Sequence, residues 1–356
     1  MKPLDGIKVL DLTRLLPGGF CTLILADLGA EIIKVEQPIM GDYIRIFEPF
    51  VDGVSIYHYT VNRGKKSIVL DLKKDEDRIK FYELVKTVDV VVESYRPSVT
   101  KKLRIDYETL RRINKRLVYC SIRGFLRDDV KRPIHDLNAQ GLSGVIDLMK
   151  KLIGKPEKVP IPIADLASGA LCAIGILSGI IKARAMGEGS NIVIGMVEAS
   201  IFWNILAIST ILGGGAVEDS LGIKSIPYYN IYETKDNKYL TVAPMEEKFW
   251  KSFVEKLGLR IENRDSKEAL KCIKDKFLTI TLDELIQLFG DNRECIEPVY
   301  DIKQVLQDDA FREIFQKIEK TDITALATPI KIDGKINMAK KAPPKLGEDN
   351  EELLEK

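Results

Sequence analysis

The stretch "IKVLDLTRLLPGGFCTLILADLGAEIIKVE" (Ile7–Glu36) decides the fold class of this chain. Its beginning, Ile7–Leu12, and its end, Glu31–Glu36, are apolar runs typical of buried strands. Between them, Gly18–Ala30 has the spacing of a helix that ends near Gly29. Two strands joined by such a helix indicate a parallel βαβ unit. No G-x-G-x-x-G follows the first strand, so a standard dinucleotide site is not expected.

The alternation of strand and helix patterns continues through the first half of the chain. It predicts a doubly wound α/β domain, whose ligands gather at the carboxyl ends of the parallel strands. Strands are expected at Ser67–Leu72, Asp89–Ser94 and Leu117–Phe125, and helices at Glu76–Val88 and Tyr107–Lys115.

The second half has a different pattern. Two long apolar helices are expected around Asp165–Ala185 and Val197–Leu212, followed by a flexible joint of three glycines. A hairpin over Tyr228–Pro244 and three amphipathic helices then predict a smaller α+β domain. Those helices are expected at Glu247–Leu257, Lys267–Phe277 and Leu282–Phe289. We therefore expect a large domain over residues 1–190, a linker helix over 191–224, a small domain over 225–300, and a return segment over 301–356 that packs on the large domain.

Composition and charge exclude several classes of partner. The net charge of +1 favours neither nucleic acid nor an anionic membrane. Five scattered cysteines without a CxxC pair argue against a disulfide framework and a zinc site, and no metal is expected. The start "MKPLDGIKVLDL" lacks the apolar core of a signal peptide. The apolar stretches Leu166–Ile181 and Ile192–Leu212 are interpreted as buried helices rather than membrane spans, and a cytoplasmic location is expected.

One of only two histidines stands in "KRPIHDLNAQGLSGV" (Lys131–Val145), at the start of an expected helix. Because the ordinary pKa of histidine lies near neutrality, His135 is a candidate acid or base, although a structural imidazole is the alternative. The other histidine, His58, has no motif around it and is interpreted as structural.

Ordered blocks along nearly the whole chain carry a resemblance to a known family. They include the opening stretch, "NRGKKSIVLDLK", "VVESYRPSVTKKL", "RLVYCSIRGF", "HDLN", "PIPIADLASGALCAIGIL", "YETKDNKYLTVAPMEEKFW" and "CIEPVYDIKQVLQDD". The chain resembles the family III CoA-transferase superfamily, and within it the α-methylacyl-CoA racemases. The resemblance implies a Rossmann-like large domain, a small domain and an interlocked homodimer. Its active site is expected between the large domain of one chain and the small domain of the other.

The resemblance also implies a set of catalytic residues for a racemase or epimerase of 2-methylacyl-CoA thioesters, in fatty acid metabolism. The H-D-x-N motif of the racemases matches His135-Asp136-Leu137-Asn138, and their partner base matches Asp165. Glu246 is expected to support the imidazole. Inversion next to a thioester needs a base on one face and an acid on the other, and the intermediate enolate needs donors, here the backbone N–H of Asp136.

Recognition of the CoA moiety is expected at the ends of the strands, with no cofactor beyond the CoA of the substrate. Cationic side chains suit phosphate oxygens. Gln37 stands where some racemases have an arginine, so one phosphate contact is missing from the expected set. The residues that the resemblance implies for CoA are Leu15, Leu72, Lys73, Tyr95, Arg96 and Lys102.

Two alternatives to a racemase stay open. A family III CoA-transferase would use Asp165 as a nucleophile that forms acyl-anhydride and CoA-thioester intermediates. Ile161, where some racemases have an asparagine, and the "NAQGLSG" segment depart from the racemase pattern, whereas His135 favours proton transfer. The remaining alternative is a CoA-binding protein without turnover.

Overall fold

The computed structural model describes residues 2–130 and 132–355, and these residues form two compact units. Unit 1 comprises Met1–Ser209 and Arg312–Lys356, and unit 2 comprises Thr210–Phe311. The chain thus leaves unit 1, forms unit 2, and returns to complete unit 1. The finer division into linker, small domain and return segment stays a prediction.

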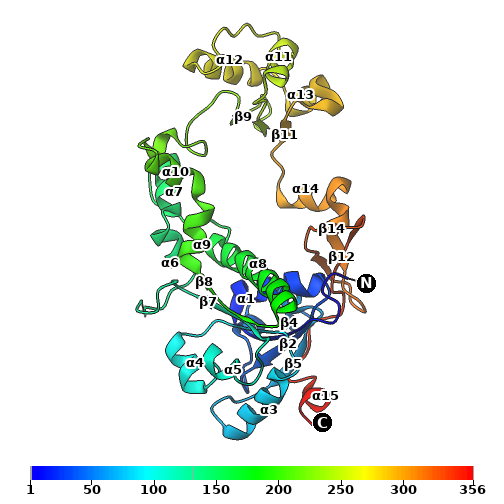
Figure 1. The fold of residues 1–356 in the computed structure, drawn as a ribbon. Helices are drawn as coiled ribbons and strands as arrows, with labels where there is room; N and C mark the ends of the chain where they lie inside the picture. Colours follow the sequence, from blue (N-terminus) through cyan, green and yellow to red (C-terminus); the bar gives the residue numbers. More distant parts are fainter. Residues whose placement is uncertain (1, 131, 356) are drawn as a thin grey trace. The chain divides into compact units, whose positions relative to one another are not determined.

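Unit 1 is built on a parallel sheet of six strands in the order β5-β2-β1-β6-β7-β8 (Figure 1). Its strands are rich in β-branched residues and largely buried, as expected for a parallel sheet covered on both faces. Their bounds are β1 Lys8–Leu12, β2 Glu31–Glu36, β5 Lys66–Val69, β6 Val90–Glu93, β7 Val118–Arg123 and β8 Ser190–Gly195. This arrangement confirms the α/β class and the first βαβ unit.

The strand order reverses between β1 and β6. From β1 the chain first builds outward through β2 to β5, and then returns to place β6 on the other side of β1. In the register of this pair, Leu12 lies beside Glu93 at the carboxyl ends of the two strands. Such a topological switch point is where open α/β sheets bind their ligands.

Alternate residues of the strands face two separate hydrophobic cores. Val9 lies in the first core with Cys21 of α1 and Ile176 of α8, whereas Leu10 lies in the second core with Phe81 of α3. Helices therefore cover both faces of the sheet, as Figure 1 shows. The helices of this region are α1 Leu15–Asp27, α2 Ile56–Asn62, α3 Asp75–Val85, α4 Pro97–Leu103, α5 Tyr107–Leu110, α6 Asp136–Leu142, α7 Val145–Ile153, α8 Ile163–Met186, α9 Met196–Trp203 and α10 Ile205–Leu212. Between β2 and α2 lie the 3₁₀ turn η1 Tyr43–Ile46 and the short strands β3 Phe50–Val51 and β4 Val54–Ser55.

Helices α1 and α8 pack at close range near their N-termini. A Cβ on Gly169 of α8 would lie 2.6 Å from the backbone oxygen of Pro17 in α1, so only glycine permits this approach. By length and composition, α8 could also cross a membrane. Half of its apolar window is nevertheless buried inside the protein, and the helix packs on α1, α9, β7 and β8, as a core helix does.

A buried ion pair ties the end of unit 1 to its beginning. Both oxygens of Asp27 accept bonds from Arg63, at 2.5 and 2.9 Å, and the two side chains are almost completely buried. The backbone N–H groups of Thr328 and Ala339 also donate to Asp27, at 2.9 and 2.8 Å. Arg63 in turn donates to the backbone oxygens of Leu326 and Ala339. The segment after residue 312 contains β12 Phe315–Lys317, β13 Thr324–Leu326, β14 Lys331–Ile332, β15 Lys335–Ile336 and α15 Asn350–Leu354.

The final residues cover the outer edge of the sheet at β5. Backbone N–H groups of Ser67 and Val69 donate to the side chains of Asp349, at 2.8 Å, and Asn350, at 2.9 Å. These groups point outward from the edge strand and would otherwise be available to another strand.

Unit 2 is a three-stranded antiparallel sheet covered by helices. The predicted hairpin is confirmed, with Asn237 in the left-handed conformation (φ 56°) at its turn. The three predicted amphipathic helices are also confirmed, and their apolar faces surround Phe253, which stacks on Phe289 with ring centroids 5.8 Å apart. The elements are β9 Asn230–Glu233, β10 Tyr239–Val242, β11 Ile296–Pro298, α11 Glu247–Lys256, α12 Lys267–Phe277, α13 Leu282–Phe289 and α14 Ile302–Gln307.

The main difference from the sequence expectation lies between residues 186 and 212. Strand β8 was not expected there, although it forms the last strand of the main sheet and pairs with β7 over six residues. The helix expected at Val197–Leu212 is two helices, α9 and α10, which are separated at Asn204. The amide of Asn204 donates to the backbone oxygen of Ser143 at 3.3 Å, which fixes this break against the end of α6.

Candidate active site

The candidate catalytic residues of unit 1 lie where α6 and α8 begin. His135 precedes α6 with an extended backbone and an exposed side chain. Its backbone N–H donates to Oδ1 of Asn138 at 3.0 Å, which closes the first turn of the helix. The H-D-x-N motif therefore has a local structural effect, because its asparagine fixes the residue that carries the imidazole.

The side chain of Asp136 joins this turn to the helix that carries Asp165. Its Oδ1 accepts bonds from the backbone N–H groups of Ala164, at 2.8 Å, and Asp165, at 3.2 Å. Its Oδ2 accepts a bond from the amide of Gln140 at 2.6 Å. A carboxylate at a helix N-terminus satisfies unpaired backbone donors and complements the helix dipole. Asp136 thus holds the start of α8 against α6.

The carboxyl group of Asp165 has an unusual protonation equilibrium. Burial raises its pKa, and the negative charge of Asp136 raises it further, to about 7. A group with a pKa near neutrality can both donate and accept a proton under ordinary conditions, which is what general acid–base catalysis requires. Desolvation and a neighbouring like charge are the physical causes by which active sites produce such values.

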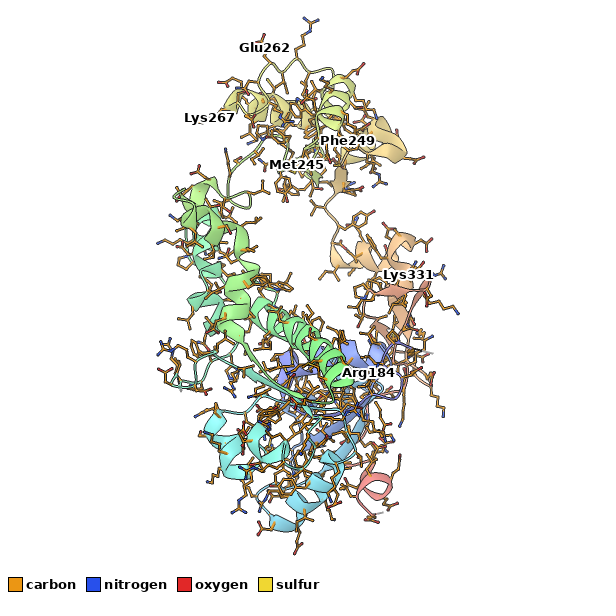
Figure 2. The ribbon with its side chains drawn as sticks, viewed as in Figure 1. Arg184, Met245, Phe249, Glu262, Lys267 and Lys331 are labelled. Carbon is orange, nitrogen blue, oxygen red and sulfur yellow. The ribbon has the colours of Figure 1, made fainter. Side chains whose placement is uncertain are left out.

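Glu246 belongs to unit 2. It precedes α11 and is exposed, one residue after Met245, which Figure 2 labels. Its expected role beside the imidazole of His135 stays a prediction.

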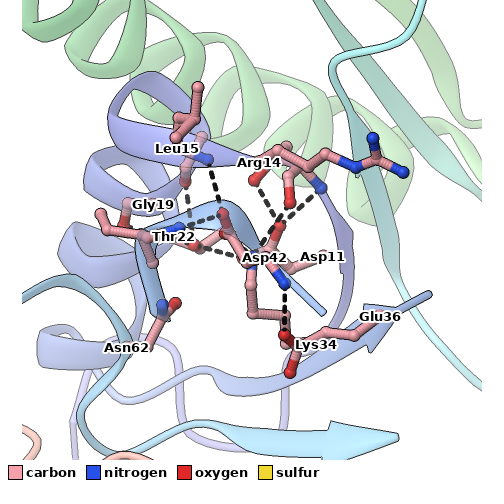
Figure 3. Close-up of polar contacts among 12 residues, drawn as sticks. Asp11, Arg14, Leu15, Gly19, Thr22, Lys34, Glu36, Asp42 and Asn62 are labelled. Carbon is pink, nitrogen blue, oxygen red and sulfur yellow. Dashed lines mark hydrogen bonds and ion pairs between the residues drawn. The ribbon is translucent and has the colours of Figure 1, made fainter. Parts of the chain in front are cut away.

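The turn between β1 and α1 is held by buried polar groups (Figure 3). Leu15 adopts the left-handed conformation, with φ 62°, which a side-chain-bearing residue rarely adopts. Its backbone N–H donates to Oδ1 of Asp42 at 3.0 Å. Lys34 binds the other oxygen of Asp42 at 2.9 Å and donates to the backbone oxygen of Thr13 at 3.0 Å. The surrounding structure therefore fixes the strained turn.

Charges buried below this turn form a network. Burial raises the pKa of Asp11, but the ammonium groups of Lys34 and Lys65 outweigh it and the net shift is downward. Lys65 contacts Asp11 at 3.2 Å, and burial lowers its pKa to about 8. The motif "TRLLPGG" contributes to the same packing, since Gly18 lies inside α1 where a Cβ would be 2.0 Å from Oγ1 of Thr13.

The residues expected to bind CoA lie after β1, β5 and β6 and in α4. Leu15 and Tyr95 follow the two strands at the switch point, and both are partly buried. Leu72 is buried in the same core that Tyr95 contacts. The three expected cations, Lys73, Arg96 and Lys102, are exposed. The structure places all six residues in unit 1, and their contact with CoA stays a prediction.

His58 has the structural role expected for it. It is buried, its Nδ1 lies 2.9 Å from the amide nitrogen of Asn62, and its Nε2 lies 3.2 Å from the backbone oxygen of Pro344. Burial and the nearby Arg45 lower its pKa to about 4. A neutral imidazole that fixes the return of the chain fits these contacts.

Sequence reasoning missed Arg14 and Asp42 as functional candidates, and it noted the "NAQGLSG" segment without foreseeing the bond from Gln140 to Asp136. Arg14 immediately precedes the turn residue Leu15, and this position at a strand end is the signal that could have identified it. Gln140 stands one helical turn after Asp136, which is the spacing of side chains on one helix face. Asp42 lies beyond β2 and is brought to Leu15 only by the fold.

Comparisons with known proteins show the family of this chain. The family model described as CoA-transferase family III matches residues 4–350. A protein of Haloarcula hispanica named succinyl-CoA:mesaconate CoA-transferase is 32% identical, over 100% of this chain and 96% of its own length. The human alpha-methylacyl-CoA racemase is 30% identical, over 99% of this chain and 92% of its own length. A crystal structure of a CAIB/BAIF family protein from Brucella suis has a TM-score of 0.84 at 27% identity, covering 99% of this chain and 98% of that one.

The chain therefore belongs to CoA-transferase family III, a family of enzymes that includes both CoA-transferases and racemases. Its relatives act on CoA thioesters by name, and the family implies an acyl-CoA substrate.

Proposed function

We propose that this chain is a racemase or epimerase of 2-methylacyl-CoA thioesters. The observation that carries the proposal is the hydrogen-bonded junction at which Asp136, next to His135, holds the backbone of Asp165. An imidazole and a carboxyl group with a pKa of about 7 are thereby set at the starts of adjoining helices. The Asp165 carboxyl can therefore change protonation state near neutral pH, which a reaction that runs in both directions requires.

The proposed reaction removes one proton from the α-carbon of the thioester and returns one proton to it. One of the two groups, His135 or Asp165, removes the α-proton from one face, and the C–H electron pair passes into an enolate of the thioester. The other group then donates its proton to the opposite face, and the enolate returns to the carbonyl form. The backbone N–H of Asp136 is the proposed donor to the enolate oxygen. Glu246 is proposed to support the imidazole, and no cofactor beyond the CoA of the substrate takes part.

A CoA-transferase is the second candidate. It is supported by the first-named relative and by the Gln140 amide, which lies in the "NAQGLSG" segment and donates to Asp136. In this reaction the carboxylate of Asp165 attacks the thioester carbonyl and expels the CoA thiolate, leaving a mixed anhydride. The CoA thiolate then attacks the Asp165 carbonyl of the anhydride, which releases the donor acid and leaves a CoA thioester on Asp165. The acceptor carboxylate attacks this thioester and expels the thiolate again, and the thiolate then attacks the acceptor acyl carbonyl of the second anhydride, which gives the new acyl-CoA and frees Asp165. The high pKa of Asp165 counts against this alternative, because the nucleophile must be ionised.

The proposal includes an interlocked homodimer. Helices α9 and α10 expose several large apolar side chains, among them Phe202 at 58%, Trp203 at 53% and Leu212 at 81%. Exposed large apolar side chains gathered along successive helices favour an interaction site. A second copy of the chain is the proposed occupant.

The experiment that separates the two reactions uses one enantiomer of a 2-methylacyl-CoA in deuterated water. A racemase exchanges the α-hydrogen with solvent in the absence of any acceptor acid, and the other enantiomer accumulates. A transferase shows no exchange under these conditions. With an added carboxylic acid, it instead moves CoA to that acid and gives a hydroxylamine-sensitive anhydride on Asp165. Detection of that anhydride together with absence of exchange would refute the racemase proposal.

A further inference from the structure

Arg14 lies at the point of the sheet where a ligand is expected, yet no catalytic or binding role was assigned to it. It follows β1, and its backbone N–H donates to Oγ of Ser94, which follows β6, at 3.2 Å. These are the two strands between which the strand order reverses. Arg14 therefore connects the two loops that form the topological switch point.

The guanidinium group of Arg14 is held in a fixed plane by aromatic rings. Its central carbon lies 5.4 Å from the ring centroid of Tyr43 and 5.3 Å from that of Tyr95. Its Nη2 donates to Oε1 of Gln37 at 3.0 Å. Stacking on aromatic faces and a rigid fork of donors are the properties that distinguish arginine from lysine.

This cation has no carboxylate partner among the described residues, although its side chain is partly buried. Other partly or fully buried cations of unit 1 are paired: Arg45 with Glu36, Arg63 with Asp27, and Lys34 with Asp42. A guanidinium group has five N–H donors, and the bond to Gln37 engages one of them. Immobilised donors without a counter-charge are suited to an anionic ligand.

We propose that Arg14 binds the diphosphate of the CoA thioester in this chain. Its immediate neighbours, Leu15 and Tyr95, are both expected to contact CoA. The bond to Gln37 brings the guanidinium to the position where the sequence lacks an expected arginine, so a cation from β1 replaces one from β2. The inference rests on the proposed function only in that the substrate is a CoA thioester, and it applies equally to a racemase and to a transferase.

The proposal predicts a selective loss of affinity. Replacing Arg14 with glutamine removes charge-assisted hydrogen bonds to the diphosphate and should weaken CoA binding on the order of 10–100-fold. Arg14→Lys keeps the charge but loses the planar fork of donors. The affinity of this variant for CoA should therefore lie between those of the wild type and Arg14→Gln. The matched control is Arg111→Gln, because Arg111 also stacks on a tyrosine, Tyr107, with its central carbon 5.5 Å from the ring centroid, but lies in the turn after α5.

Calorimetric titration of the full chain with CoA and with 3′-dephospho-CoA tests the assignment, together with KM values for acyl-CoA and the phosphate-free acyl-pantetheine. We expect Arg14→Gln to weaken the binding of CoA and of 3′-dephospho-CoA by the same factor and to leave the KM of acyl-pantetheine unchanged. The variant should melt within a few degrees of the wild type. An equal rise of KM for acyl-CoA and for acyl-pantetheine in Arg14→Gln would mean that Arg14 only supports the fold. A loss for CoA but not for 3′-dephospho-CoA would assign Arg14 to the 3′-phosphate and overturn the proposal.

The wild-type and variant titrations together separate this inference from the proposed function, because CoA binding that is the same in the wild type and in Arg14→Gln would overturn this inference alone. A wild-type chain that fails to bind CoA would refute both. Should Arg14→Gln be too unstable to titrate, Arg14→Lys and the salt dependence of wild-type binding decide instead. Wild-type affinity for CoA in Arg14→Lys, with no dependence of wild-type binding on salt, would overturn the assignment.

Discussion

Oδ1 of Asp136 lies 3.2 Å from the backbone nitrogen of Asp165 and accepts its hydrogen bond. The residue beside the candidate imidazole is therefore also the residue that positions and electrostatically perturbs the candidate carboxyl group. One carboxylate couples the two proposed acid/base groups, so a change at Asp136 should alter the pH at which the enzyme works.

Asp136→Asn should lower the pKa of Asp165, because it removes the nearby negative charge while keeping an oxygen to accept the backbone bonds of α8. Oε1 of Gln140 has no hydrogen-bond partner among the described residues, and it can accept a bond from the new amide after the Gln140 amide rotates. The pH–rate profile of deuterium exchange should shift to lower pH. Asp147→Asn, an exposed change on α7, is the control. An unchanged profile in Asp136→Asn would show that the charge does not act on Asp165.

The two enantiomers should respond oppositely to pH. Where Asp165 is the base, it must be ionised, so exchange of that enantiomer should rise as pH increases through about 7. Where Asp165 is the acid, it must be protonated, so inversion of the other enantiomer should fall over the same interval. Initial rates for each pure enantiomer between pH 5 and 9 measure the two pH dependences. Parallel pH–rate profiles for the two enantiomers would contradict the prediction.

His135→Ala should lower the racemisation rate on the order of 10²–10⁴-fold, because one face of the α-carbon loses its acid/base group. With Asp165 intact, one enantiomer should still exchange its hydrogen without inversion. Asp165→Ala should confine exchange to the other enantiomer, and Glu246→Gln should have a smaller effect. Chiral chromatography and mass spectrometry distinguish inversion from exchange. Wild-type racemisation in a folded His135→Ala protein would make this imidazole structural.

Asp27→Ala should destabilise unit 1 strongly. It leaves the buried Arg63 without its counter-charge and removes the acceptor for the N–H groups of Thr328 and Ala339, at a cost of about 3–5 kcal/mol. Glu83→Ala breaks an exposed pair with Lys86 and should leave the unfolding free energy nearly unchanged. Denaturant titration of both variants measures the difference, and equal midpoints would show that the buried pair contributes little.

The proposed dimer should survive dilution. Interlocked chains cannot separate without unfolding, so the native mass should stay at two chains until the fold melts. Sedimentation at falling protein concentration tests this, and an active single chain would refute the interlocked arrangement.

Much of the fold follows from local patterns in the sequence. The first βαβ unit and the helices of unit 2 have clear apolar periodicity, and they were predicted within a few residues. Strand β8 was not predicted. Its sequence, "SNIVIG", is a short apolar run beside a long apolar helix, and periodicity alone does not distinguish a buried strand from a helix there. The break at Asn204 depends on a bond to Ser143, which is distant in sequence.

The candidate site was predictable in its parts but not in its connections. The family resemblance implied His135, through the H-D-x-N motif, and Asp165 separately. The link through the Asp136 carboxylate depends on how α6 meets α8, and the stacking of Arg14 depends on rings that follow β2 and β6. Both are tertiary relationships that no window of local sequence contains.

The bonds from Asp349 and Asn350 to β5 also bear on how the protein is made. A ribosome releases β5 early, but Asp349 and Asn350, which cover its open edge, follow their partners in β5 by 282 and 281 residues. At typical elongation rates the interval is on the order of tens of seconds. During that time the edge strand of the nascent chain offers unpaired N–H groups to any neighbouring strand, so chaperones that protect exposed strand edges should contact this protein before Asp349 and Asn350 emerge.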